Sequence, residues 1–249
     1  MEFGEAQIAE IFHISFLATL ARRLDPARYV LKGGANLRYF FDSVRYSEDI
    51  DIDSLGVPSW NLEKKVDDLL AKGPLPLLLQ PAGVEIREVS KPKQTDTTQR
   101  WKIALSAAGR EEPVRTKVEF SHREGPGGFR LESIPPTVVA PYALRAPTVQ
   151  HYSGDVPAEQ KVEALAGRSE TQARDVFDLD LLLRRRPLPA GRLDAEMLTE
   201  AAERALELPF DAFRDQVLPF LEPDVTELYD AAAWEQMQTF VAEHLEGRR

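Results

Sequence analysis

The sequence contains no cysteine among its 249 residues. This absence excludes a disulfide scaffold, a thiol nucleophile, an iron–sulfur cluster and a zinc site built on cysteine. It fits a reducing compartment, and we expect a cytoplasmic protein. The four histidines are scattered without the spacing of a metal site: His13, His122, His151 and His244.

Long hydrophobic runs are missing as well. The longest apolar stretch near the start, Ile11 to Ala21, is interrupted by polar residues and falls short of the roughly 18–20 residues that a membrane span needs. The first residues carry no basic segment, so we expect neither a secretory signal nor a membrane partner. Hydrophobic residues still make up 43 % of the chain, which excludes a disordered or fibrous protein.

Positive charge is scarce, because 31 Lys and Arg residues stand against 41 Asp and Glu residues and the net charge is −10. Such a balance argues at first against a nucleic-acid partner. However, residues 190–249 alone hold 14 acidic and 5 basic side chains, whereas residues 85–130 hold 10 basic and 7 acidic ones. The charge therefore does not exclude RNA. We expect the acidic C-terminal part to face away from RNA or to meet a basic partner.

The periodicity of the chain predicts two domains, one from 1 to 140 and one from 141 to 249. The first combines predicted helices at 4–24, 35–41 and 60–71 with predicted strands at 29–31, 49–55, 84–89, 100–107 and 114–121. Residues 91–96 are predicted to form a loop and residues 125–128 a turn. The second domain has helical patterns at 158–168, 171–185, 194–206 and 225–246. The fold class is thus α/β (α+β), with a mixed sheet followed by a helical domain.

The most informative segment is Arg-Tyr-Ser-Glu-Asp-Ile-Asp-Ile-Asp, residues 45–53. Side chains alternate faces in a strand, so Ser47, Asp49, Asp51 and Asp53 share one face. Carboxylates in a row repel one another, and a divalent cation relieves this because Mg²⁺ prefers hard oxygen ligands. A solvated strand face is the alternative interpretation.

A Gly-Gly turn upstream strengthens the cation interpretation. A β-like run from Tyr29 to Leu31 ends in Lys32, Gly33 and Gly34, and the next residues look helical. Such a turn presents backbone N–H groups and a helix N-terminus, which together suit a phosphate group. The combination of Gly-Gly, short helix and paired acids predicts a site for a phosphate-bearing ligand.

Two later segments add charged candidates. On the predicted strand 114–121, Lys117 and Glu119 share one face, although an exposed strand face would show the same pattern. On the predicted helix 158–168, Lys161 and Arg168 flank an apolar stripe, where long basic side chains can also simply reach past the rim of a core.

The helix predicted at 171–185 carries acids on its apolar side. At 100° per residue, Asp175 and Asp178 lie inside the apolar arc and Asp180 lies opposite. Buried charges are costly unless they are paired. Arg174 and Asp178 are spaced to pair, which leaves Asp175 without a local partner and makes it the better functional candidate. The alternative is a buried ion-pair network that joins the two domains.

These motifs resemble the AbiEii family of nucleotidyltransferase-like toxins. The resemblance rests on residues 31–38 and 45–51 and on the Arg-Asp-x-x-Asp-Leu segment, and it covers roughly residues 25–185. The family comprises the toxin halves of type IV toxin–antitoxin and abortive-infection systems and is related to the MenT toxins. The resemblance implies a polymerase-β-like nucleotidyltransferase domain with a helical domain closing the active-site cleft. Gly34 stands where the wider superfamily has Ser, and Ser47 would supply the hydroxyl contact to phosphate in its place.

The resemblance also implies roles for individual residues. Asp49, Asp51 and Glu119 would hold Mg²⁺ (or Mn²⁺), with Glu119 standing where the family has Asp. The catalytic set would be completed by Lys161, on the nucleotide phosphates, and by Asp175, which would orient nucleotide or acceptor. The expected nucleotide and phosphate contacts come from Lys32, Gly33, Gly34, Ser47, Lys117 and Arg174.

The implied reaction is transfer of NMP from an NTP to an acceptor. In related toxins the acceptor is the 3′ end of tRNA, which is therefore the first hypothesis, and the implied partner is a DNA-binding antitoxin of the AbiEi type. Two alternatives remain: an NTP (GTP)-binding interaction protein without transfer, and NMP transfer to a protein hydroxyl.

Overall fold

The structure is a computed structural model that describes residues 3–122, 125 and 127–247. The chain forms two compact units. Unit 1 comprises the residues up to Phe40 together with Tyr46–Tyr152. Unit 2 comprises the short segment Phe41–Arg45 together with the residues from Ser153 onward.

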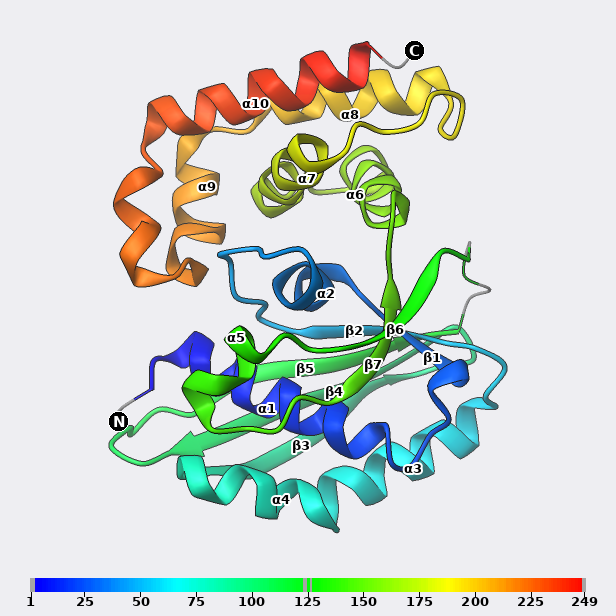
Figure 1. The fold of residues 1–249 in the computed structure, drawn as a ribbon, viewed down its shortest axis with the longest axis vertical. Coiled ribbons are helices and arrows are strands. Elements are labelled where there is room, and N and C mark those ends of the chain that lie inside the picture. Colours follow the sequence, from blue (N-terminus) through cyan, green and yellow to red (C-terminus); the bar gives the residue numbers. More distant parts are fainter. Residues whose placement is uncertain (1–2, 123–124, 126, 248–249) are drawn as a thin grey trace. The chain divides into compact units, whose positions relative to one another are not determined.

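Unit 1 is built on a mixed sheet, which within the described residues has seven strands in the order β3-β4-β5-β2-β1-β7-β6 (Figure 1). At its centre β2 runs parallel to β5 and antiparallel to β1. The mixed sheet confirms the predicted fold class. The strands are β1 Tyr29–Lys32, β2 Ile50–Ser54, β3 Val84–Gln94, β4 Thr98–Ala107, β5 Val114–Ser121, β6 Phe129–Ser133 and β7 Thr148–Tyr152.

The helices of unit 1 cover this sheet. α1 contacts β4 and β5 and also packs against α3 and α4, whereas α2 packs on β1 and β2. α1 is buried on most of its circumference, as expected for a helix that is apolar on nearly all sides. The bounds are α1 Glu5–Leu20, α2 Gly33–Phe40, α3 Ser59–Ala71, α4 Pro74–Leu79 and α5 Pro136–Val139.

Two predicted features of unit 1 differ from the structure. β7 was not predicted, and the boundary expected near residue 140 assigned it to the helical part, but it pairs with β1 and β6 in the sheet. The loop predicted at 91–96 is wrong in part, because β3 continues to Gln94. β3 is an edge strand, where Pro92 is tolerated. The turn predicted at 125–128 falls partly outside the described residues.

Unit 2 is helical, as the patterns from residue 158 onward predicted. α6 packs on α7 and α8, and α10 packs on α7 and α8. The predicted helix at 225–246 begins only at Ala231, where the Asp230 side chain caps it by accepting a hydrogen bond from the Ala233 N–H. The helices are α6 Val156–Gly167, α7 Ala173–Arg185, α8 Ala195–Glu207, α9 Phe210–Gln216 and α10 Ala231–Glu246.

The segment Phe41–Arg45 belongs to unit 2 through its backbone. The Val44 carbonyl accepts a hydrogen bond from the Glu222 N–H at 3.0 Å, and Arg45 forms an antiparallel bridge with Leu221. A stretch that directly precedes β2 in the sequence is therefore held by residues from the C-terminal part of the chain.

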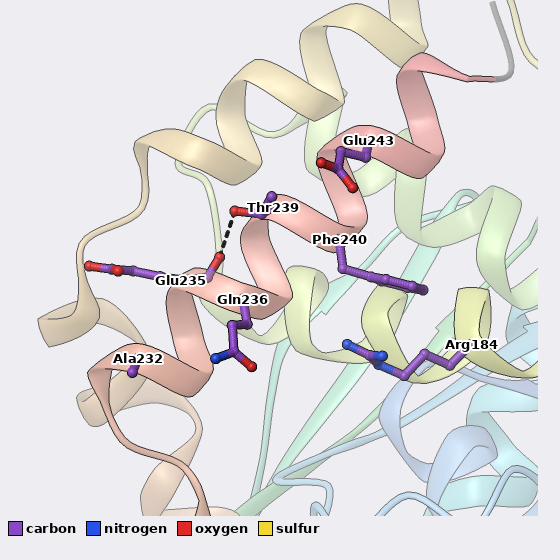
Figure 2. A pocket seen from close by; sticks show the side chains of 7 residues that line it. All are labelled: Arg184, Ala232, Glu235, Gln236, Thr239, Phe240 and Glu243. Carbon is purple, nitrogen blue, oxygen red and sulfur yellow. Dashed lines mark hydrogen bonds between the residues drawn. The ribbon is translucent and has the colours of Figure 1, made fainter.

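A shallow hollow of unit 2 lies on α10 and the end of α7 (Figure 2). The Arg184 guanidinium lies 4.0 Å from the centre of the Phe240 ring and also pairs with Asp180. None of the predicted site residues lines this hollow. Its lining consists of Arg184, Ala232, Glu235, Gln236, Thr239, Phe240 and Glu243.

In the described part of the chain, every helix is too short or too polar to span a lipid bilayer.

Candidate functional site

The predicted carboxylates of unit 1 meet at the junction of β2 and β5. Asp51 and Glu119 are direct neighbours across these parallel strands, and Asp49 lies immediately before β2. Partial burial raises the pKa of Asp51 above its usual 3.8, and the nearby charges of Asp49 and Glu119 act in the same direction. Lys117 and Lys32 oppose this effect. The structure thus brings the three expected metal ligands together.

Two basic side chains pair with these carboxylates. The Lys117 ammonium lies 2.6 Å from Asp49 Oδ2, and Arg100 Nε lies 2.6 Å from Glu119 Oε2. The side chains of both pairs are partly exposed to solvent. The like charges of the acidic group are therefore balanced by side chains of the chain itself.

Arg100 was not predicted from the sequence. It lies on β4 directly opposite Glu119 on β5, because these strands pair antiparallel in that register. Periodicity shows which residues of one strand share a face, but it does not give the register between two strands. Arg100 could have been found by aligning residues 98–107 with residues 114–121 as neighbouring antiparallel strands, which places Arg100 opposite Glu119.

The Gly-Gly turn lies against the same carboxylates. Gly33 has a φ of +68°, which favours glycine, and a Cβ built at this position would lie 2.9 Å from Asp51 Oδ2. Both the backbone and the close approach therefore require the absence of a side chain. Gly33 and Gly34 form the start of α2, so the N-terminus of that helix begins beside Asp51.

Ser47 and Asp53 have partners of their own. The Ser47 hydroxyl donates a hydrogen bond to the Asp49 carbonyl at 2.7 Å, which stabilises the turn before β2. Asp53 is buried and binds Lys32 and Tyr152. Of the acids predicted to share a face, Asp53 is thus committed to contacts different from those of Asp49 and Asp51.

Within the described ranges, no group of three or more His, Asp or Glu side chains stands ready to hold a metal ion. The donors of Asp49, Asp51 and Glu119 are nonetheless hard carboxylate oxygens, the type that Mg²⁺ prefers. In this structure Lys117 and Arg100 supply positive charge to two of these three closely grouped carboxylates, and a divalent cation would supply it in their place. The residues present therefore fit a divalent cation by their chemistry.

A second cluster of predicted residues lies inside unit 2. Asp175 and Asp178 on α7 are fully buried, and the Lys161 ammonium from α6 lies 2.8 Å from Asp175 Oδ1 and 2.6 Å from Asp178 Oδ2. Arg168 approaches Asp175 at 3.4 Å, and Arg45 binds both carboxylate oxygens of Asp178 at 2.9 and 3.0 Å. The cluster is a buried ion-pair network.

Asp175 was predicted to have no partner on its own helix, and the partners that it has come from outside α7. Its partners, Lys161 and Arg168, come from the preceding helix and from the residue that ends it. Asp178, expected to pair with Arg174, binds Arg45 and Lys161. The periodicity of one helix shows which side chains are buried, but not what the neighbouring helix presents to them. Arg174 itself is partly exposed on α7.

The electrostatics of this network favour its charged form. Burial by itself would lower the pKa of Lys161, but Asp175 and Asp178 outweigh it and raise that pKa. Burial would raise the pKa of Asp178, but Arg45 and Lys161 outweigh it and lower that pKa. Lys161 and Asp178 are therefore ionised at neutral pH.

A buried histidine supports the segment before Asp49 and gives unit 1 a pH dependence. His13 Nε2 lies 2.7 Å from the Thr116 hydroxyl, which in turn donates to the Glu48 carbonyl. Burial lowers the pKa of His13 to about 4, and Asp49 opposes this shift only in part. Because the unfolded chain binds a proton at about 6.5, stability is lost as the pH falls from about 6.5 to 4.

We expect the free energy of unfolding to fall by about 3 kcal/mol over this window through His13 alone. The His13→Gln variant should lose this share of the pH dependence in urea titrations between pH 7 and pH 4. His244→Gln, a change on the last turn of α10, serves as the control. An unchanged slope in His13→Gln would contradict the assignment.

The chain matches the family described as "Nucleotidyl transferase AbiEii toxin, Type IV TA system" over residues 15–247. It belongs to this family. The match extends over both units and confirms the resemblance that the motifs indicated. This AbiEii protein is accordingly a nucleotidyltransferase, and family membership implies an NTP substrate and an antitoxin partner.

Two crystal structures have the same fold as the AbiEii chain. JHP933 from Helicobacter pylori is 19 % identical, with a TM-score of 0.60 and coverage of 99 % of this chain and 96 % of that one. A second H. pylori protein, described as a candidate nucleotidyltransferase, is 19 % identical, with a TM-score of 0.58 and coverage of 100 % and 99 %. A search of curated proteins found no match. At this identity the two structures support the fold alone.

Proposed function

We propose that this AbiEii protein transfers NMP from an NTP to the 3′ end of tRNA and thereby blocks translation or growth. The observation that carries the proposal is the grouping of Asp49, Asp51 and Glu119 beside the Gly-Gly turn. In the reaction an acceptor hydroxyl oxygen forms a bond to the α-phosphorus of the NTP. The bond between the α-phosphorus and the bridging oxygen breaks, and pyrophosphate leaves with the electron pair.

The residues that would hold Mg²⁺ (or Mn²⁺) are Asp49, Asp51 and Glu119. When bound, a divalent cation lowers the negative charge on the triphosphate and on the departing pyrophosphate. Lys117 and Arg100 now pair with two of these carboxylates and are accessible from solvent. If those carboxylates held a cation, Lys117 and Arg100 would be available to phosphate oxygens.

The remaining phosphate contacts come from the start of α2. Gly33 and Gly34 offer backbone N–H groups at the helix N-terminus, Lys32 adds an ammonium, and Ser47 lies in the turn that leads to Asp49. The absence of a side chain at Gly33 leaves the backbone open to a close approach. This arrangement favours a polyphosphate over an uncharged ligand.

The roles of Lys161, Asp175 and Arg174 follow from the resemblance and stay a prediction. Lys161 and Arg174 would contact nucleotide phosphates, and Asp175 would orient the nucleotide or acceptor. The buried network holds Lys161 in its charged form, which such a role requires.

Two charged regions support the expected partners. Residues 85–130, with their excess of basic side chains, include β3, β4 and β5 and favour contact with RNA phosphates. Residues 190–249 are strongly acidic, which favours a basic partner such as a DNA-binding antitoxin of the AbiEi type. Binding to either partner should weaken as the salt concentration rises.

The proposal is tested by incubating the full chain with tRNA, Mg²⁺ and each α-labelled NTP. We expect label on tRNA, and we expect tRNA whose 3′ hydroxyl has been oxidised with periodate to remain unlabelled. Label on co-incubated proteins would instead establish NMP transfer to a protein hydroxyl. NTP binding without any covalent product would establish an interaction protein. Either of these two results overturns the tRNA assignment.

A further inference from the structure

Asp53 is the second acid of β2, and both of its carboxylate oxygens have partners. Oδ1 accepts a hydrogen bond from the Lys32 ammonium at 2.5 Å, and Oδ2 accepts one from the Tyr152 hydroxyl at 2.7 Å. The residue is only 4 % exposed. A carboxylate this buried, with one oxygen bound to an ammonium and the other to a phenol, is fixed in orientation through both of its oxygens.

The Lys32 ammonium is oriented by more than one strand. It also donates to the Ser121 hydroxyl at 3.2 Å. Its partners thus come from β2 and β5, while Lys32 itself ends β1 and Tyr152 ends β7, and these four strands are consecutive in the sheet. An ammonium has three N–H donors, of which Asp53 and Ser121 direct two. The side chain of Lys32 keeps 22 % of its surface exposed, so solvent still reaches it.

Lys32 lies next to the acidic group of the candidate site. It is the direct neighbour of Asp51 across β1 and β2, and it immediately precedes Gly33. Its backbone therefore lies at the start of α2, where the proposed function puts the phosphates of the NTP, and Asp53 and Ser121 hold its ammonium on the same face of the sheet as Asp51. A flexible lysine would lose side-chain entropy on binding a phosphate, whereas an ammonium already held in position loses less.

We infer that Asp53 and Tyr152 are positioning residues that hold the Lys32 ammonium for the phosphate groups of an NTP. The inference rests on the proposed function, because it takes the ligand of Lys32 to be the triphosphate. Asp53 acts directly on Lys32, and Tyr152 acts through Asp53. Neither of the two touches the nucleotide.

Tyr152 is suited to this task because it is itself held from two sides. Its backbone carbonyl accepts a hydrogen bond from the Asn36 side chain of α2 at 3.0 Å. Burial raises the pKa of its hydroxyl, which therefore stays protonated and remains a donor at neutral pH. Without that hydroxyl, Asp53 Oδ2 loses its donor and the carboxylate can rotate away from Lys32.

The test measures the Kd of each NTP for the full chain at equilibrium, together with KM and kcat for transfer. Tyr152→Phe and Asp53→Asn are expected to raise Kd and KM about tenfold and to change kcat less than twofold. Lys32→Met should weaken binding at least as much. In the Lys32→Met background, adding Asp53→Asn should weaken binding no further, because Asp53 acts through Lys32.

The matched control is Tyr29→Phe on β1. It removes a buried hydroxyl that has no hydrogen-bond partner among the described residues, so Kd should stay within twofold of wild type. If Asp53→Asn does not fold, as judged by circular dichroism, Tyr152→Phe alone carries the test, because it only removes an oxygen atom.

The inference is overturned if Tyr152→Phe binds NTP as tightly as wild type, or if Asp53→Asn weakens binding equally with and without Lys32. NTP binding with the expected pattern but without label transfer would overturn the proposed function and leave the inference standing. Label transfer with unchanged Kd values in the variants would overturn the inference and leave the proposed function standing. A wild-type chain that binds no NTP overturns both.

Discussion

The Asp51→Asn variant is expected to lose nucleotidyl transfer by roughly 1000-fold, which corresponds to about 4 kcal/mol of transition-state stabilisation. The reason is that Asp51 lies at the centre of the acidic group, beside Glu119 and next to Gly33. Asparagine keeps the shape of the side chain but removes the negative charge that a divalent cation needs. Asp49→Asn should have a similar effect. Label on tRNA and growth after expression are the two measurements.

The melting temperature of the Asp51→Asn variant distinguishes a loss of catalysis from a loss of the folded structure. Partial burial and like charges already raise the pKa of Asp51, so a neutral residue at this position should not lower the melting temperature. Glu88→Gln, a change to an exposed acid on the edge strand β3, should leave transfer within twofold of wild type. Persistent growth inhibition by a folded Asp49→Asn or Asp51→Asn variant would show that the metal interpretation is wrong.

The Asp178→Asn variant is expected to lower the free energy of unfolding by about 3–5 kcal/mol, because it leaves Arg45 and Lys161 buried with less negative charge to pair with. For a chain of this size the melting temperature should fall by roughly 10 °C. Asp178 is fully buried, and its pKa is lowered by these two cations. Thermal and urea unfolding of the full chain measure the effect.

Asp180→Asn provides the matched control on the same helix. Asp180 is on the opposite side of α7 and pairs with the half-exposed Arg184, so its loss should cost less than about 1 kcal/mol. Equal effects of the two variants would contradict a special role for the buried network. A stable Asp178→Asn protein would show that other residues supply enough negative charge to Arg45 and Lys161.

Much of the candidate site could be predicted from neighbouring residues in the chain. Alternation puts Asp49 and Asp51 on one face of a strand, and the Gly-Gly pair marks a turn into a helix. Helical periodicity likewise put Asp175 and Asp178 on the buried side of α7, which the structure confirms. These features depend on residues within a few positions of one another, so the local pattern contains them.

Contacts between distant segments could not be predicted in this way. Arg100 and Glu119 are 19 residues apart, and their pairing depends on how β4 aligns with β5. Tyr152 and Asp53 are 99 residues apart, and they meet only because β7 joins the sheet beside β1. The β7 strand is five residues long and carries no clear alternation, which is why its place in unit 1 was missed.

The sequence by itself therefore determined the family, many of the helices and strands, and the acids that mark the site, because each of these is encoded in a short run of residues. Only the tertiary structure decided which cation pairs with each acid. It assigns Lys117 to Asp49, Arg100 to Glu119, Lys32 to Asp53, and Lys161 to both Asp175 and Asp178. The physical reason is that a charge selects its partner by distance in space, which strand register and helix packing set and local periodicity does not record.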